Sequence, residues 1–107
     1  MPENTLIVLT TLPDRDSAEH LAERLIAENL AACVNIFPEM TSVYRWKGTI
    51  ERGSERQMVI KTTRARYDAL QNAIRERHPY ELPEILALSV ADGLPAYLDW
   101  IAKCTTN

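Results

Sequence analysis

Residues 32–62 constrain the fold more than any other part of the sequence, because they are typical of one long β-hairpin. Residues 40–46 alternate between two faces, and Lys47 and Gly48 supply a turn before a return arm over residues 49–62. At about 3.3 Å per residue, residues 32–46 could extend to roughly 45 to 50 Å, whereas a domain of this size has a radius of gyration of about 13 Å. We therefore expect the hairpin to overhang its own domain.

An overhanging hairpin would expose strand edges and apolar side chains unless another molecule covers them. Its tip carries four such side chains, Val43, Tyr44, Trp46 and Ile50. We therefore expect a cyclic homo-oligomer that is interlocked by hairpins. The alternative is a hairpin that bends back onto its own domain at Pro38 and Gly53. In either case we expect Gly53 and Ser54 to interrupt the return arm.

The segments around the hairpin supply the other elements. Residues 5–11 are β-branched and predict a buried strand, and Asp16 is expected to open a helix in which Glu19 completes a capping box. Asn29 can end that helix in a left-handed conformation. The expected inward-facing residues of this helix are Ala18, Leu21, Ala22, Leu25 and Ile26.

A second helix is expected to begin after Thr62 or Thr63 and to stop at His78, because Pro79 disfavours the helical region for the residue before it. A last strand over residues 85–90 and a C-terminal helix follow. The inward-facing residues are expected to be Tyr67, Leu70, Ala73 and Ile74 in the second helix, and Leu94, Tyr97, Leu98 and Ile101 in the third.

The order of these elements predicts an α+β fold, a ferredoxin-like β-α-β-β-α-β sandwich with a long hairpin and an extra C-terminal helix. A single domain is expected over residues 1–107. Both main helices should cover one face of the sheet. The strands are apolar on both faces near Ile36, Ile60 and Leu88, so the other face should meet a partner.

Composition excludes several classes of function. Twelve Lys and Arg against fifteen Asp and Glu give a net charge of −3, which disfavours a nucleic-acid partner. Three glycines and no G-x-G-x-x-G pattern disfavour a phosphate-binding loop. No apolar stretch approaches the roughly 18 residues of a membrane span, and neither a signal peptide nor a disulfide framework is expected. These features predict a soluble cytoplasmic protein.

Five blocks of the sequence closely resemble the CutA divalent-cation tolerance family. They are LAACVN at 30–35, SVYRWKGTIE at 42–51, IKT at 60–62, HPYELPEI at 78–85 and YLDW at 97–100. The resemblance runs in order from about residue 6 to residue 100. It implies a homotrimer of ferredoxin-like subunits, similar in architecture to the PII signalling proteins, that is cytoplasmic and linked to tolerance of copper and other divalent ions. It implies no enzymatic activity, and the sequence contains no recognisable set of catalytic residues.

Candidate metal ligands are few. His78 and Glu81 share one proline-stiffened loop, and copper(II) favours imidazole whereas copper(I) favours thiolate, which makes Cys33 a further candidate. The alternatives are that His78 caps its helix and that Cys33 is a small buried hydrophobe. Some family members carry a cysteine and a second histidine where this chain has Thr10 and Arg77, so the resemblance leaves His78 as the only match. We expect weak binding of copper(II) or another divalent cation.

A second group of residues predicts a ligand cleft between subunits. Lys61, Tyr80, Tyr44 and Trp46 would line it and would suit a small anionic ligand. The alternatives are a lysine that extends toward solvent and aromatic packing in an interface. The sequence thus supports two hypotheses: a trimeric divalent-cation tolerance protein, and a PII-like signalling or adaptor trimer that binds a small anionic metabolite.

Overall fold

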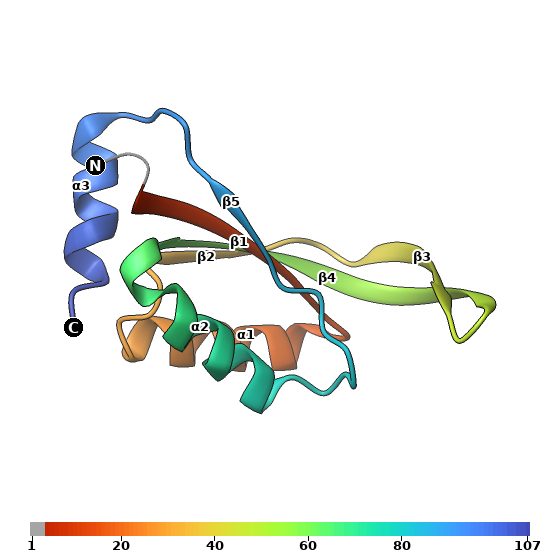
Figure 1. Cartoon of the computed structure of the whole chain (residues 1–107). Helices are drawn as coiled ribbons and strands as arrows, with labels where there is room; N and C mark the ends of the chain where they lie inside the picture. The colour runs from red at the N-terminus through yellow and green to blue at the C-terminus, as the bar shows by residue number, and fades with distance from the viewer. Residues whose placement is uncertain (1–3) are drawn as a thin grey trace.

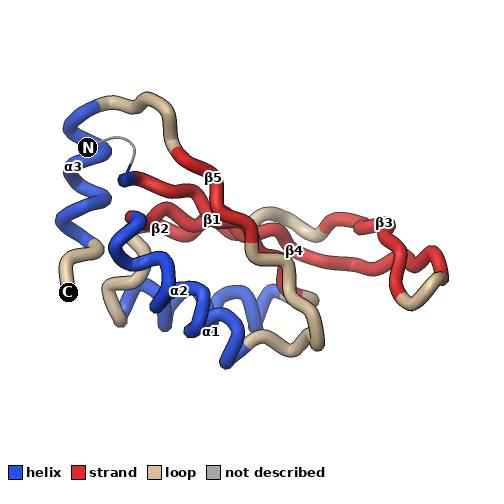
Figure 2. The backbone as a smooth tube through the Cα atoms, in the orientation of Figure 1, coloured by secondary structure: helices blue, strands red, loops and turns tan. Residues whose placement is uncertain are grey.

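Five strands and three helices follow one another in the expected order (Figures 1 and 2). The structure, a computed structural model, describes residues 4–107. The elements are β1 (Thr5–Leu12), α1 (Arg15–Ala27), β2 (Cys33–Ile36), β3 (Met40–Trp46), β4 (Thr49–Thr63), α2 (Arg64–Arg77), β5 (Leu86–Ser89) and α3 (Pro95–Cys104). The fold is α+β, as predicted.

The five strands form one antiparallel sheet around the long strand β4. The strand order is β2-β4-β1-β5, and β3 pairs with the part of β4 nearest the hairpin turn. β1 pairs with β4 from Thr5 opposite Thr63 to Leu12 opposite Arg56. Strand β1 therefore lies between β4 and β5, as the predicted β-α-β-β-α-β order requires.

Helices α1 and α2 cover one face of the sheet, and the hydrophobic core lies between them and β1 and β4 (Figure 1). Leu6 and Val8 of β1 are buried on that face, whereas the intervening Ile7 is only half-buried because it points to the opposite face. The core cluster consists of Val8, Leu12, Ala18, Leu21, Ala22, Leu25, Leu30, Ala31, Met58, Ile60, Leu70, Ala73 and Ile74.

Helix α1 begins earlier than the sequence indicated. Asp14, not Asp16, is the N-cap, and its Oδ1 accepts a hydrogen bond of 2.8 Å from the backbone N–H of Ser17. A cap carboxylate satisfies an N–H that would otherwise lack a partner. The expected left-handed end is confirmed, since Asn29 has a φ of 58° and the Leu30 N–H donates to the carbonyl of Leu25 at 2.9 Å.

Helix α2 begins after Thr63 and ends before His78, as expected from the proline that follows. The prediction of inward-facing residues was less accurate. Ile26 in α1 is 41% exposed, Leu94 is 70% exposed and Tyr97 in α3 is 40% exposed. Helix α3 stands at one end of the sheet rather than over its face, so only part of its apolar stripe contacts the chain (Figure 1).

The β3–β4 hairpin extends beyond the helices, as predicted (Figure 1). The molecule measures 44 × 26 × 24 Å along its principal axes. The expected interruption at Gly53 and Ser54 is wrong, because these residues pair with Ser42 and Thr41 and β4 continues through them. Their backbone groups fit the ladder, so no bend returns the hairpin to its own domain.

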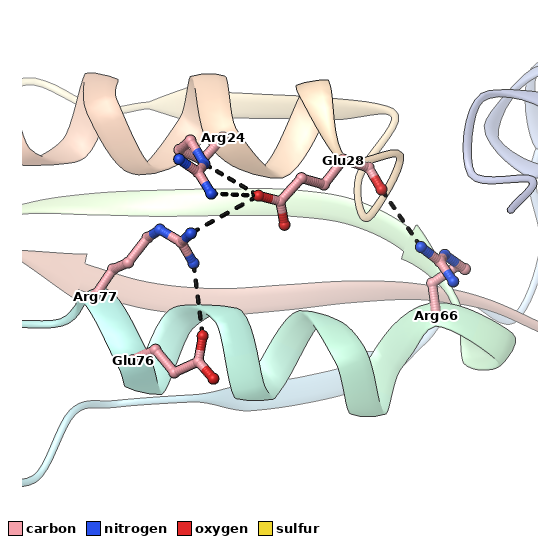
Figure 3. A network of polar contacts seen from close by, with 5 residues as sticks. All are labelled: Arg24, Glu28, Arg66, Glu76 and Arg77. Carbon is pink, nitrogen blue, oxygen red and sulfur yellow. Dashed lines mark hydrogen bonds and ion pairs between the residues drawn. The ribbon is translucent and has the colours of Figure 1, made fainter.

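A surface network connects the two covering helices (Figure 3). The Glu28 carboxylate at the end of α1 lies 2.6 Å from Arg24 and 3.7 Å from Arg77 of α2. Arg66, also on α2, donates to the carbonyl oxygens of Glu28 and Asn29 at 3.4 and 3.2 Å. Because these side chains are largely exposed, each pair contributes only modestly to stability.

Within residues 4–107, each helix is too short or too polar to span a lipid bilayer.

Candidate functional site

A cleft of about 860 Å³ lies between the β3–β4 hairpin and the loop that follows α2. Three of the four residues expected in a ligand cleft, Tyr44, Trp46 and Tyr80, line it together. Glu81 lines it as well. The structure thus brings two distant sequence blocks, 42–51 and 78–85, to one place.

Local structure explains how the hairpin contributes to this cleft. Strand alternation places Ser42, Tyr44 and Trp46 on the same face of β3. Glu55 of β4 pairs with Met40 and therefore shares that face. The Tyr44 ring also leans over Gly53, where an added Cβ would lie 3.6 Å from the phenolic oxygen.

Carboxylates dominate the charge of the cleft. Glu55, Glu81 and Glu84 line it, and no Lys, Arg or His is among its lining residues. The side-chain amide of Gln57 donates to Glu84 at 3.3 Å and to the carbonyl of Thr10 at 2.9 Å, which ties this carboxylate to β1. The cleft of one chain is therefore electronegative, which suits a cation better than an anion.

Tyr80 is held as a neutral phenol beside these carboxylates. Burial, and secondarily a hydrogen bond to the Glu55 side chain, raise the pKa of Tyr80 well above its ordinary value. The hydroxyl therefore remains protonated.

Hydrogen bonds occupy both ring nitrogens of His78. The backbone N–H of Tyr80 donates to Nδ1 at 3.1 Å, so the proton resides on Nε2, which donates to the carbonyl oxygen of Thr11 at 2.6 Å. Burial lowers the pKa of His78 despite that contact and the nearby charge of Glu55, so the ring is neutral at physiological pH. The structure does not show the helix cap that was the alternative for His78. The ring forms hydrogen bonds with β1 and with its own loop, and not with the last carbonyl oxygens of α2.

The other predicted site residues lie elsewhere in the chain. Lys61 pairs across the sheet with Cys33, and its Nζ lies 3.9 Å from the Cys33 sulfur and 5.9 Å from the centre of the Tyr97 ring. Lys61 is thus absent from the cleft lining, and Cys33 does not join His78 and Glu81. The predicted cleft that contains both Lys61 and Tyr80 lies between subunits and stays a prediction, because one chain does not bring these two residues together.

The described residues do not fit a resident metal centre. Between residues 4 and 107, no three His, Cys, Asp or Glu side chains come together closely enough to hold a metal ion. Thr10 is completely buried, and its hydroxyl has no hydrogen-bond partner among these residues.

Sequence reasoning missed Glu55. It placed Glu84 with Glu81 on the loop that begins at His78, but did not count Glu84 among the candidate ligands. Glu55 could have been found only from the pairing of β3 with β4, since its place opposite Met40 depends on the hairpin register.

Comparison with known proteins gives one consistent family. The family model described as "CutA1 divalent ion tolerance protein" matches residues 6–104. The divalent-cation tolerance protein CutA of Thermus thermophilus is 42% identical over 99 residues, which cover 92% of this chain and 96% of that protein. Protein CutA of Mus musculus is 41% identical over 107 residues, which cover 100% of this chain but 60% of the mouse protein.

Solved structures agree with the sequence comparison. The crystal structure of CutA1 from Shewanella sp. SIB1 superposes with a TM-score of 0.95 at 34% identity, and the match covers 100% of both chains. Such agreement over full length covers the hairpin and α3 as well as the central sheet.

Proposed function

The chain belongs to the CutA1 divalent ion tolerance family, and from that premise we propose that it acts in divalent-cation tolerance as a cytoplasmic homotrimer that binds these cations weakly. The cations are ligands of the electronegative cleft rather than resident cofactors. The role is one of binding and not of catalysis.

The carboxylate lining of the cleft carries this proposal. Glu55, Glu81 and Glu84 surround it without a basic side chain among the lining residues, and carboxylate oxygens are ligands for hard divalent cations. Copper(II) is the first ion to test, because it binds most N and O sites more tightly than the other divalent first-row ions. His78 contributes little directly, since a metal ion would have to displace one of its two hydrogen bonds.

The uncovered surface of one chain supports the trimer. Leu86 and Leu88 of β5 pair with Leu9 and Ile7, so they lie on the sheet face opposite the helices, and they are 57% and 50% exposed. Val43 and Ile50 are exposed on the protruding hairpin. An apolar face next to an overhanging hairpin suits contact with further copies of the same chain.

Lys61 favours a second candidate function, binding of a small anionic metabolite by a PII-like trimer. Among the described residues, no carboxylate lies within 4.0 Å of its ammonium group, and its contacts are the Cys33 sulfur and the Tyr97 ring. An anionic ligand would supply the missing negative charge. Its site would be separate from the electronegative cleft.

Isothermal titration calorimetry with copper(II) tests the first candidate. Wild type should bind weakly, and the double variant Glu55→Gln/Glu81→Gln should bind at least about fivefold more weakly, which corresponds to about 1 kcal/mol. Glutamine preserves size and hydrogen bonding while removing charge. Glu23→Gln on the exposed face of α1 is the matched control and should bind like wild type.

An unchanged affinity in the double variant would remove the cleft from the proposal. His78→Ala provides a separate comparison. If it binds copper(II) as tightly as wild type, the imidazole is not a ligand. A large loss would show that His78 either binds the ion or positions Tyr80 and Glu81 for it.

A further inference from the structure

The aromatic rings of the cleft have no evident role in binding an inorganic divalent cation. Such an ion keeps a shell of water and oxygen ligands, which carboxylates and carbonyls supply. Tyr44, Trp46 and Tyr80 instead line the same cleft as three carboxylates. Aromatic rings attract organic cations, whose charge is spread over weakly hydrated groups.

Much of the remaining lining is apolar. Leu82 contributes an aliphatic side chain, and Pro79 and Pro83 contribute rigid rings from the loop after α2. A volume of about 860 Å³ falls within the range typical of sites for small organic molecules. The cleft thus combines negative charge with aromatic and aliphatic surface.

The carboxylates are already arranged for a positively charged group. Tyr80 lines the cleft together with Glu55, and Gln57 holds Glu84 at 3.3 Å. Neither partner neutralises the carboxylate that it contacts, because a phenol and an amide carry no charge. The negative charge of both groups therefore remains available to a ligand.

We propose that this cleft binds an alkylammonium ion, with the ammonium group against the rings of Tyr44, Trp46 and Tyr80 and its charge balanced by the three glutamates. The alkyl chain lies along Leu82 and the two prolines. This inference rests on the proposed function only in treating the same cleft as a cation site. It adds the chemical class of ligand that the aromatic rings select.

Fluorescence of Trp46 provides a direct probe. The protein has two tryptophans, so the substitution Trp100→Phe leaves Trp46 as the only indole. This protein is titrated with 1,4-diaminobutane and, separately, with tetramethylammonium chloride, and potassium chloride keeps the ionic strength constant. We expect a saturable change in emission with both ammonium compounds and none with potassium chloride alone.

Substitutions at Tyr44 separate this inference from divalent-cation binding. Tyr44→Leu keeps an apolar wall but removes the ring, and should weaken ammonium binding about fivefold. Tyr44→Phe keeps the ring and should bind like the parent protein. Neither substitution should alter the affinity for copper(II), whereas Glu81→Gln should weaken binding of both ligands. Circular dichroism confirms that each variant is folded.

Two results would overturn the inference. One is the absence of a saturable signal with either ammonium compound. The other is a signal that survives unchanged in folded Tyr44→Leu. In both cases the copper(II) titration is independent, so the proposed cation-tolerance role stands or fails by its own result.

Discussion

His78 joins three segments at one edge of the cleft. It terminates α2, its Nε2–H donates to the carbonyl of Thr11 on β1, and its Nδ1 accepts the backbone N–H of Tyr80. The ring therefore fixes the start of the loop that carries Tyr80 and Glu81. One neutral imidazole thus positions two residues of the cleft.

This bonding predicts a pH dependence of stability. Burial lowers the pKa of His78 below its ordinary value of 6.5, so the unfolded chain takes up the proton first as the pH falls. The contribution of the neutral ring to the free energy of unfolding is therefore fully present above about pH 6.5. It is lost as the pH decreases through the pKa of His78 in the folded state. A proton on Nδ1 would also abolish the hydrogen bond that this nitrogen accepts from the Tyr80 N–H.

Thermal melting between about pH 7 and pH 5 measures this effect. The decrease in Tm on acidification should be smaller in His78→Gln than in wild type. His20→Gln, on the exposed face of α1, is the control and should follow wild type. Equal pH dependence in wild type and His78→Gln would show that His78 has no such role.

The hairpin turn shows how two residues determine the shape of a much longer element. Lys47 and Gly48 have φ values of 50° and 82°, the left-handed conformations of a type I′ turn. This turn matches the twist of the two strands and sets the register from Trp46 opposite Thr49 to Met40 opposite Glu55. The register in turn places Glu55 on the same face as Tyr44.

We expect Gly48→Ala to destabilise the protein by about 1 kcal/mol, because a Cβ is unfavourable at positive φ. Gly53→Ala is the matched control within the same hairpin. Its added Cβ would meet Tyr44 at an ordinary contact distance of 3.6 Å, and no positive φ is required there. Guanidinium unfolding measures both free energies. Equal losses in the two variants would contradict a specific role for the turn.

The whole molecule is elongated, and much of its apolar surface lies away from the core. The exposed apolar residues include Leu86 and Leu88 on the open face of the sheet and Val43 and Ile50 on the hairpin. The covering helices reach only one face (Figure 1). Surface of this kind is the physical basis for the proposed trimer.

Light scattering after gel filtration tests the oligomeric state. Wild type should have about three times the mass of one 12.2 kDa chain. Leu88→Glu places a charge on the open face and should reduce the mass toward that of one chain. Ile26→Glu alters an equally apolar residue on the helical side, where it is 41% exposed, and should leave the mass unchanged. A wild-type mass near 12 kDa would contradict the trimer.

The sequence by itself determined the order of elements, the end of α1 at Asn29, the end of α2 before Pro79 and the turn at Lys47 and Gly48. These features depend on local backbone preferences, which neighbouring residues set. The sequence also predicted that the hairpin extends beyond its own domain. The expected break at Gly53 was wrong, because pairing with β3 overrides the low strand preference of glycine.

Only the tertiary structure decided which side chains share a site. The pairing of β3 with β4 and the docking of the 78–85 loop bring Glu55 to Tyr80, and the pairing of β2 with β4 takes Lys61 to Cys33 instead. The negative charge of the cleft within one chain follows from this packing. Contacts between residues distant in sequence depend on register and packing, and no local pattern of residues encodes them.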